Sequence, residues 1–255
     1  MAPVLHVVRA GAGPRILCIH GSAADHTTWS IQLASALRER FTLIAYDRRE
    51  DVVSLEDHAE DAAQLLASAP GPALVVGSSF GGVVALEIAR RRPPQLAGAV
   101  LIEPPLAASD AAASSPSTFL DDLDRRAAEA GGPAAAELFL RRVLGDATFE
   151  RMPRRFQDRA TSKFAQIRAD SVALLAYRPR YAELARIATP VLLLGGGRSA
   201  PRFRPTLEAL RRSLGRARLE ILDGAGHMLH AEAPRRFADL LAGFAAETLG
   251  QLAPP

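Results

Sequence analysis

The chain has 255 residues, of which 48% are hydrophobic and 23% charged, and its formal net charge is +3. This balance is typical of a folded globular protein and excludes a disordered chain. No apolar run reaches the ~18 residues that a membrane span needs. The single cysteine, Cys18, excludes an intrachain disulfide and a thiolate metal cluster. Residues 1–13 lack the long apolar segment of a secretory signal, so we expect a cytoplasmic protein.

The positive charge is spread along the chain. Lys163 is the only lysine, and arginine doublets such as Arg125-Arg126 recur with acids such as Asp121 among them. A nucleic-acid-binding protein gathers its cations on one face, with aromatic residues between them. We therefore expect solvated helix faces and neither a nucleic-acid partner nor a membrane partner.

Short apolar runs predict strands along most of the chain. Continuous runs of this length favour strands that are buried on both faces, as in a parallel sheet. The predicted strands are Leu5–Val8, Arg15–Ile19, Phe41–Tyr46, Ala73–Val76, Gly98–Ile102, Val191–Leu194 and Arg218–Leu222.

Helical patterns lie between the predicted strands, at Thr28–Glu39, Leu55–Ser68 and Gly81–Arg92, and a last one covers Pro234–Thr248. Ser54 stands at the position of an N-cap, and the third helix stops before Pro93, which cannot continue a helix. This alternation of strands and helices predicts an α/β fold with right-handed crossovers.

The middle of the chain has a different pattern. No convincing strand is found between residues 107 and 188, which are rich in alanine and charged residues and broken by Gly131-Gly132-Pro133. We predict a core made of residues 1–106 and 189–255, with residues 107–188 inserted as a helical cap.

The most informative motif is Gly77-x-Ser79-x-Gly81, which follows a predicted strand and precedes a predicted helix. A serine at such a sharp turn projects from the carboxyl edge of the sheet as a nucleophile, and small residues two positions before and after it avoid clashes. The backbone N–H of Phe80 then lies at a helix N-terminus, where it can bind a developing oxyanion. Ser78 is the neighbouring alternative, but the two glycines flank Ser79 symmetrically.

The pair His20-Gly21 ends an earlier strand, and Trp29 follows it. Together with the serine motif, this segment resembles the oxyanion loop of the α/β-hydrolase superfamily. The resemblance implies an α/β-hydrolase fold, with a mostly parallel sheet flanked by helices. It also implies that the N–H of Ser22 is the second oxyanion donor and that His20 is structural. The alternative is that His20-Gly21 only terminates a strand.

Gly226-His227 follows the last predicted strand and resembles the histidine loop of the same superfamily. A serine hydroxyl is a poor nucleophile at neutral pH, and an imidazole within hydrogen-bond reach can remove its proton. We therefore predict His227 as the base, with His230 as a less favoured alternative.

The acid that orients the imidazole is harder to assign. The superfamily commonly places an aspartate after the strand here predicted at Val191–Leu194, yet residues 195–206 contain no carboxylate. Glu103 follows the strand Gly98–Ile102, and some branches of the superfamily have their acid there. Parallel strands bring their carboxyl ends to one edge, so we predict Glu103. The alternatives are a purely structural Glu103, or Asp223 or Glu208 as the acid.

The three motifs together predict a serine hydrolase, similar to carboxylesterases, that cleaves a small carboxylic ester or lactone without a metal or other cofactor. Two alternatives stay open: a lyase, thioesterase or other biosynthetic enzyme on the same scaffold, and a ligand-binding protein without turnover.

We interpret Asp47-Arg48-Arg49, which follows the predicted strand Phe41–Tyr46, as charged residues that fix a loop. The oligomeric state cannot be deduced from these patterns.

Overall fold

A single seven-stranded sheet organises the computed structural model, which describes residues 4–110 and 117–250. The strand order is β1-β3-β2-β4-β5-β6-β7, and all neighbours are parallel except β1, which runs antiparallel to β3. The strands are β1 (Val7–Ala10), β2 (Arg15–Ile19), β3 (Thr42–Tyr46), β4 (Ala73–Ser78), β5 (Leu96–Ile102), β6 (Val191–Gly196) and β7 (Ala217–Leu222). The predicted parallel α/β fold is confirmed. Residues 1–3 and 251–255 of the predicted core and 111–116 of the predicted cap lie outside the described residues.

Three of the four predicted helices are present. They are α2 (Leu55–Ala67), α3 (Phe80–Arg91) and α12 (Pro234–Gly250), and the short α11 (Leu229–Glu232) precedes the last. The Ser54 side chain caps α2 by accepting a hydrogen bond from the N–H of Asp57.

The continuous helix predicted at Thr28–Glu39 is wrong. The segment is broken into η1 (His26–Trp29), α1 (Ser30–Leu33) and η2 (Ala36–Glu39). The break follows from Ser35, which has extended backbone angles and accepts a hydrogen bond from the N–H of Leu37. A serine that caps a new turn competes with continuation of the old one.

Both faces of the sheet are covered, as alternate side chains of each strand require. Leu17 and Ile19 of β2 belong to one buried cluster, with residues from α2, α3 and α10 (Phe203–Ser213). Ile16 and Cys18 of the same strand belong to the other cluster, with Trp29 and residues from α12. The doubly covered sheet gives the loops at its carboxyl edge a rigid base.

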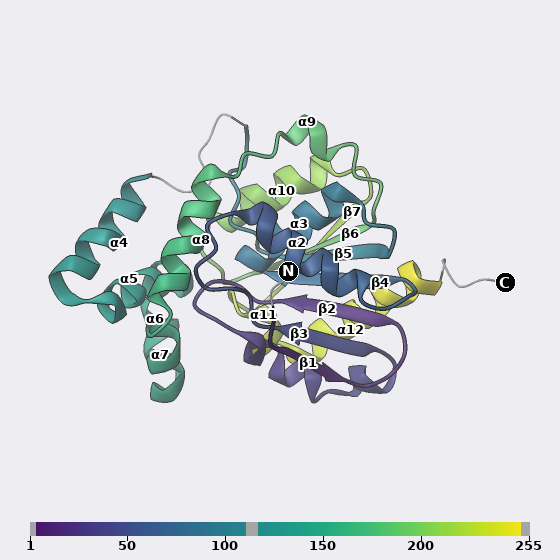
Figure 1. Ribbon diagram of the computed structural model, residues 1–255, viewed down its shortest axis with the longest axis horizontal. Coiled ribbons are helices and arrows are strands. Elements are labelled where there is room, and N and C mark those ends of the chain that lie inside the picture. Colours follow the sequence, from purple (N-terminus) through teal and green to yellow (C-terminus); the bar gives the residue numbers. More distant parts are fainter. Residues whose placement is uncertain (1–3, 111–116, 251–255) are drawn as a thin grey trace.

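Helices fill the chain between β5 and β6, and no strand is found among its described residues. Figure 1 shows α4 to α7 standing apart at one end of the molecule, with α8 between them and the sheet. These helices enclose a small buried cluster of their own, which includes Phe119, Leu123, Phe149 and Ile167. Ala23, from the loop after β2, also belongs to that cluster, so this loop contacts both the sheet and the helices. The helices are α4 (Ser117–Ala130), α5 (Gly132–Leu144), α6 (Asp146–Arg151), α7 (Arg154–Thr161), α8 (Phe164–Ala176) and α9 (Tyr181–Leu184).

None of the helices in the described ranges combines the length and the apolar character that crossing a bilayer requires.

The turn between β4 and α3 depends on close backbone packing. A Cβ atom at Gly77 would lie 2.0 Å from the carbonyl oxygen of Gly81, and a Cβ at Gly81 would lie 2.3 Å from the carbonyl oxygen of Ile19. Both contacts are with backbone, which cannot rotate away as a side chain can. The two glycines of the motif are therefore a packing requirement of the turn.

We predict that Gly77→Ala lowers the free energy of unfolding by about 3 kcal/mol, because the new methyl group forces β4 and α3 apart. The matched control is Gly243→Ala on α12, where a Cβ meets open space. Alanine there raises stability by about 0.5–1 kcal/mol, because glycine is the poorer helix former. Urea denaturation measures both, and equal stability of the two variants would contradict the packing argument.

Candidate active site

Ser79 occupies a strained turn at the carboxyl end of β4. Its backbone angles are φ 54° and ψ −120°, and its N–H donates to the carbonyl oxygen of Ile102 at 2.8 Å. A positive φ in a residue other than glycine costs energy and persists only where the surroundings enforce it. Ser78, the neighbouring alternative, lies within β4 and is buried. The strained position is thus that of Ser79, the predicted nucleophile.

The loop after β2 lies directly against Ser79. A Cβ atom placed on Gly21 would be 3.0 Å from the Ser79 Cβ and 3.7 Å from its Oγ. Glycine at this position brings the loop backbone beside the hydroxyl.

His20 is held inside this loop as a neutral ring. Its Nε2 accepts a hydrogen bond from the N–H of Arg48 at 3.0 Å, so Nδ1 carries the proton and donates to the carbonyl oxygen of Gly21 at 2.8 Å. Burial, together with the charge of Arg48, lowers the pKa of His20 well below its ordinary value. Both ring nitrogens are engaged, so the ring has no free nitrogen with which to act as a base.

Two backbone N–H groups border the same place. In the described part of the chain the N–H of Ser22 meets no protein acceptor, while its hydroxyl donates to Asp170 of α8 at 2.6 Å. Phe80 is the first residue of α3, and first-turn N–H groups have no partner within their own helix. An oxyanion formed at the Ser79 hydroxyl could therefore accept from both predicted donors.

His227 and Glu103 are brought together from two strand ends. The His227 Nδ1 donates to Oε2 of Glu103 at 2.6 Å, and both side chains are almost completely buried. Phe203 stacks on the imidazole with ring centroids 4.5 Å apart. Within the described residues the buried Nε2 has no hydrogen-bond partner. Because Nδ1 keeps the proton that it donates to the carboxylate, Nε2 is the basic nitrogen.

Gly195 and Gly196, at the end of β6, border Glu103 near the place where the superfamily's usual aspartate would stand. The N–H of Gly196 donates to Oε1 of Glu103 at 2.7 Å. A Cβ at Gly196 would lie 2.5 Å from the carbonyl oxygen of Gly226, so a side chain there would push the histidine loop away. The carboxylate that binds His227 belongs to Glu103, which follows the neighbouring strand β5.

Positive φ angles mark these loops. In the described parts of the chain, the residues other than glycine with positive φ are Ala23, Ser79, Arg92 and Glu103. Three of them lie in the loops that carry the predicted site residues, and Arg92 ends α3. Strain that gathers at one edge of a sheet is typical of a functional site.

The model of the alpha/beta hydrolase family matches residues 16–240, which is most of the sequence. The chain belongs to the alpha/beta hydrolase family. It is 36% identical to lipase LipV of Mycobacterium tuberculosis over 145 residues, covering 50% of this chain and 55% of that one. It is also 32% identical to a pimeloyl-[acyl-carrier protein] methyl ester esterase of Vibrio parahaemolyticus over 106 residues, covering 40% and 41%. The chain thus spans about two fifths to just over half the length of these relatives.

The fold is similar to that of a solved esterase from Thermogutta terrifontis. The TM-score is 0.79 at 24% identity, and the match covers 96% of this chain and 94% of the other. At this level of identity the likeness concerns the fold. The chain thus belongs to a family whose named members here include a lipase and an esterase.

The alternative residues considered from the sequence lie elsewhere in the structure. His230 is fully buried against Trp29 and Phe237, and in the described structure neither of its ring nitrogens has a partner. Asp223 is exposed, and Glu208 pairs with Arg204 on α10.

Sequence analysis missed three contributions to the site. Glu232 accepts from the N–H of Gly226 at 2.9 Å and so braces the histidine loop. Phe203 provides the ring that stacks on His227. Asp170 binds Arg48, the residue that we interpreted as fixing a loop, and it stands in an alanine-rich helix without any motif. Asp170 and Arg48 are 122 residues apart, and a pair this distant in sequence leaves no spacing signal.

One surface cluster contains groups that could hold a metal ion. One ligand atom each from His6, His26 and Asp47 lie within 4.8 Å of one another. Asp47 already accepts from the N–H and Nδ1 of His26, both at 2.8 Å. The bonds that are present thus tie the end of the loop after β2 to the end of β3.

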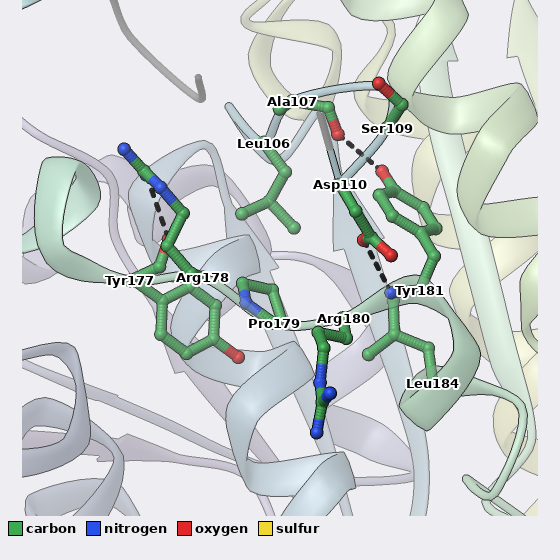
Figure 2. A pocket seen from close by; sticks show the side chains of 10 residues that line it. All are labelled: Leu106, Ala107, Ser109, Asp110, Tyr177, Arg178, Pro179, Arg180, Tyr181 and Leu184. Atoms are coloured by element: carbon green, nitrogen blue, oxygen red, sulfur yellow. Dashed lines mark hydrogen bonds between the residues drawn. The ribbon is translucent and has the colours of Figure 1, made fainter. Parts of the chain in front are cut away.

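A small cavity of about 60 Å³ lies where the inserted helices join the sheet. Figure 2 shows the Tyr181 hydroxyl pointing to the carbonyl oxygen of Ala107, which it meets at 2.6 Å, and the Asp110 carboxylate meeting the N–H of Tyr181. None of the predicted catalytic residues lines this cavity. It marks the junction between the segments that leave β5 and return toward β6.

The buried His230 makes stability depend on pH. Burial, and then the charge of His227, lowers the pKa of His230 to about 3. An unfolded histidine titrates near 6.5, so between pH ~6.5 and 3 the unfolded chain binds a proton that the folded chain refuses. The titration of His230 therefore lowers the free energy of unfolding as the pH falls through this window, and above the window it has no effect.

We predict that His230→Phe makes the fall of stability with pH less steep by about 1.4 kcal/mol per pH unit below pH ~6. The aromatic contacts with Trp29 and Phe237 survive the change, while the titrating group is removed. Urea denaturation at pH 7, 6, 5 and 4 measures the slope, and the range from pH 7 to 8 is the control, where the two slopes should agree. Parallel curves down to pH 4 would contradict the prediction.

Proposed function

We propose that this protein is a serine hydrolase that cleaves a small carboxylic ester or lactone through an acyl-enzyme. The observation that carries the proposal is the 2.6 Å hydrogen bond from His227 to Glu103, which leaves the Nε2 of a buried imidazole free. The strained Ser79 turn and the adjacent loop after β2 support it.

In the proposed first step, the Oγ of Ser79 attacks the acyl carbon while the Nε2 of His227 takes its proton. The electron pair of the C=O bond moves to oxygen, and this oxyanion accepts hydrogen bonds from the N–H groups of Ser22 and Phe80. Glu103 keeps the imidazole in the required tautomer and stabilises its positive charge. The tetrahedral intermediate collapses as the bond to the alcohol oxygen breaks and Nε2 returns the proton to that oxygen.

In the second step a water molecule attacks the acyl-enzyme and gives its proton to Nε2. The new intermediate releases the carboxylic acid, and Ser79 recovers the proton. Each step uses only groups of this chain, substrate and water, so no cofactor is required by the proposal. The substrate is a small molecule.

We further propose that residues 107–188 form a cap over this site. Their separate buried cluster and their place between β5 and β6 support this division. A cap of this kind determines which acyl and alcohol groups reach Ser79.

The contact between Glu103 and His227 also favours a catalytic protein over a binding protein without turnover. The lack of a carboxylate in residues 197–206, after β6, is a feature that favours the latter alternative, and the buried Glu103 carboxylate, which follows β5 and is bound to His227, offsets it. Nothing in the arrangement favours lyase chemistry over hydrolysis.

The first test is labelling by a fluorophosphonate probe, which reacts with activated serines. We expect the wild-type protein to be labelled and to hydrolyse p-nitrophenyl acetate, and Ser79→Ala to lose both, because the nucleophile is absent. Ser78→Ala is the matched control and should keep both. An unlabelled wild-type protein would refute the proposed function.

The second test concerns the acid. Glu103→Gln should lower kcat by about 10³-fold, since the amide neither fixes the required tautomer nor stabilises the imidazolium. KM for p-nitrophenyl acetate should change little, because Glu103 does not touch the substrate in this scheme. A kcat equal to that of the wild type would place the acid elsewhere.

A further inference from the structure

A buried ion pair connects α8 with the segment after β3. Arg48 donates to both carboxylate oxygens of Asp170, at 2.9 and 2.8 Å, and the two side chains are 0% and 1% exposed. Paired hydrogen bonds of this kind fix the planes of both groups relative to each other. Asp170 comes from the inserted helices, whereas Arg48 follows β3.

The same guanidinium holds the loop backbone. Its Nε donates to the carbonyl oxygen of His20 at 3.2 Å, and its Nη2 donates to that of Gly21 at 3.1 Å. Its carbon atom lies 4.4 Å from the centre of the Phe80 ring. One cation therefore contacts the residues on both sides of the proposed oxyanion hole.

Asp170 also reaches the donor residue itself. Its Oδ2 accepts the hydroxyl of Ser22 at 2.6 Å, in addition to the bond from Arg48. His58 faces this pair, with Nε2 3.3 Å from the Arg48 Nη1. Burial, together with the charges of Arg48 and Arg49, lowers the pKa of His58 to about 2, so this ring stays neutral and adds no competing charge.

We propose that Asp170 is a positioning residue for the oxyanion hole. Through Arg48 and the Ser22 hydroxyl it fixes the position of the Ser22 N–H, which donates to the oxyanion. The position of α8 against the core therefore determines the geometry of the oxyanion hole. This inference rests on the proposed function.

A purely structural role would be an attachment of α8 to the core, and α8 has other attachments. Gln166 exchanges two hydrogen bonds with the backbone of Ala24, both at 3.1 Å, and Lys163 pairs with Glu50. These contacts hold the helix without touching Ser22. The contacts of Asp170, by contrast, converge on the donor residue.

The two roles differ in their kinetic signature. A misplaced oxyanion donor weakens binding of the transition state more than binding of the substrate, so kcat falls while KM stays constant. Loss of an attachment alone lowers thermal stability and leaves kcat of the folded enzyme unchanged.

The cleanest variant is Ser22→Ala, which removes one hydrogen bond and leaves both the backbone N–H and the Arg48–Asp170 pair. We expect kcat for p-nitrophenyl acetate to fall about 10-fold at constant KM, less than the 10²–10³-fold typical of losing a donor outright. Affinity for a trifluoromethyl ketone, whose serine adduct carries an oxyanion, should fall by the same factor.

Asp170→Asn is the second variant, with a larger expected loss in kcat of about 10²-fold, because Arg48 loses its countercharge. Its matched control is Asp124→Asn on α4. This change breaks an exposed ion pair with Arg168, which lies on α8 like Asp170, and it should leave kcat unchanged. Circular dichroism checks folding, and Ser22→Ala provides the result if Asp170→Asn does not fold.

Unchanged kcat and unchanged ketone affinity in Ser22→Ala would overturn the inference, and so would a change confined to KM or to thermal stability. In each case fluorophosphonate labelling of the wild-type protein shows that the proposed function stands. An unlabelled wild-type protein would instead refute the proposed function, and this inference with it.

Discussion

The carboxylates of Glu103 and Asp170 are buried at the carboxyl edge of the sheet, and each must be compensated there. An uncompensated charge in a protein interior costs several kcal/mol, so partners have to be supplied in fixed positions. Glu103 is compensated by the ring of His227 and the N–H of Gly196, and Asp170 by Arg48 and Ser22. Since these partners come from different loops, the loops cannot move independently. The order of the site follows from this constraint.

The backbone bears part of the cost. Glu103 and Ser79 have positive φ angles, and Gly196 stands where any side chain would strike the histidine loop. Strain of about 1–3 kcal/mol per residue is tolerated where the surroundings enforce it. Here the parallel strands enforce it, because β4, β5 and β6 are neighbours whose registers are fixed by their hydrogen-bond ladders. In the proposed mechanism the acid follows β5 instead of β6, which is possible because the two strand ends lie side by side.

Local patterns were sufficient to predict the sheet. Each strand is a short apolar run, and the turn at Ser79 has its own glycine signature, so the fold and the position of Ser79 could be deduced from sequence. Glu103 could be proposed from its place after a strand and from the resemblance to some branches of the superfamily, but its contact with His227, 124 residues away, has no local signal. Asp170 could not be found, because its contacts depend on how the inserted helices pack. The prediction of a continuous helix at Thr28–Glu39 was wrong because the apolar pattern does not show where a serine side chain caps a new turn, as Ser35 does here.

The same energetics divide the inserted helices into two groups. Helix α8 is held by a buried ion pair and by the buried Gln166, and breaking such contacts leaves polar groups without partners. Helix α4 packs on α8 through the buried cluster of Phe119, Leu123 and Ile167, and its exposed ion pair with α8, Asp124–Arg168, contributes at most about 1 kcal/mol. The buried polar contacts that hold the inserted helices to the loops of the sheet are therefore those of α8. In the proposed mechanism this arrangement makes α8 the helix that holds the loop beside Ser79, through the contacts of Asp170 with Arg48 and Ser22.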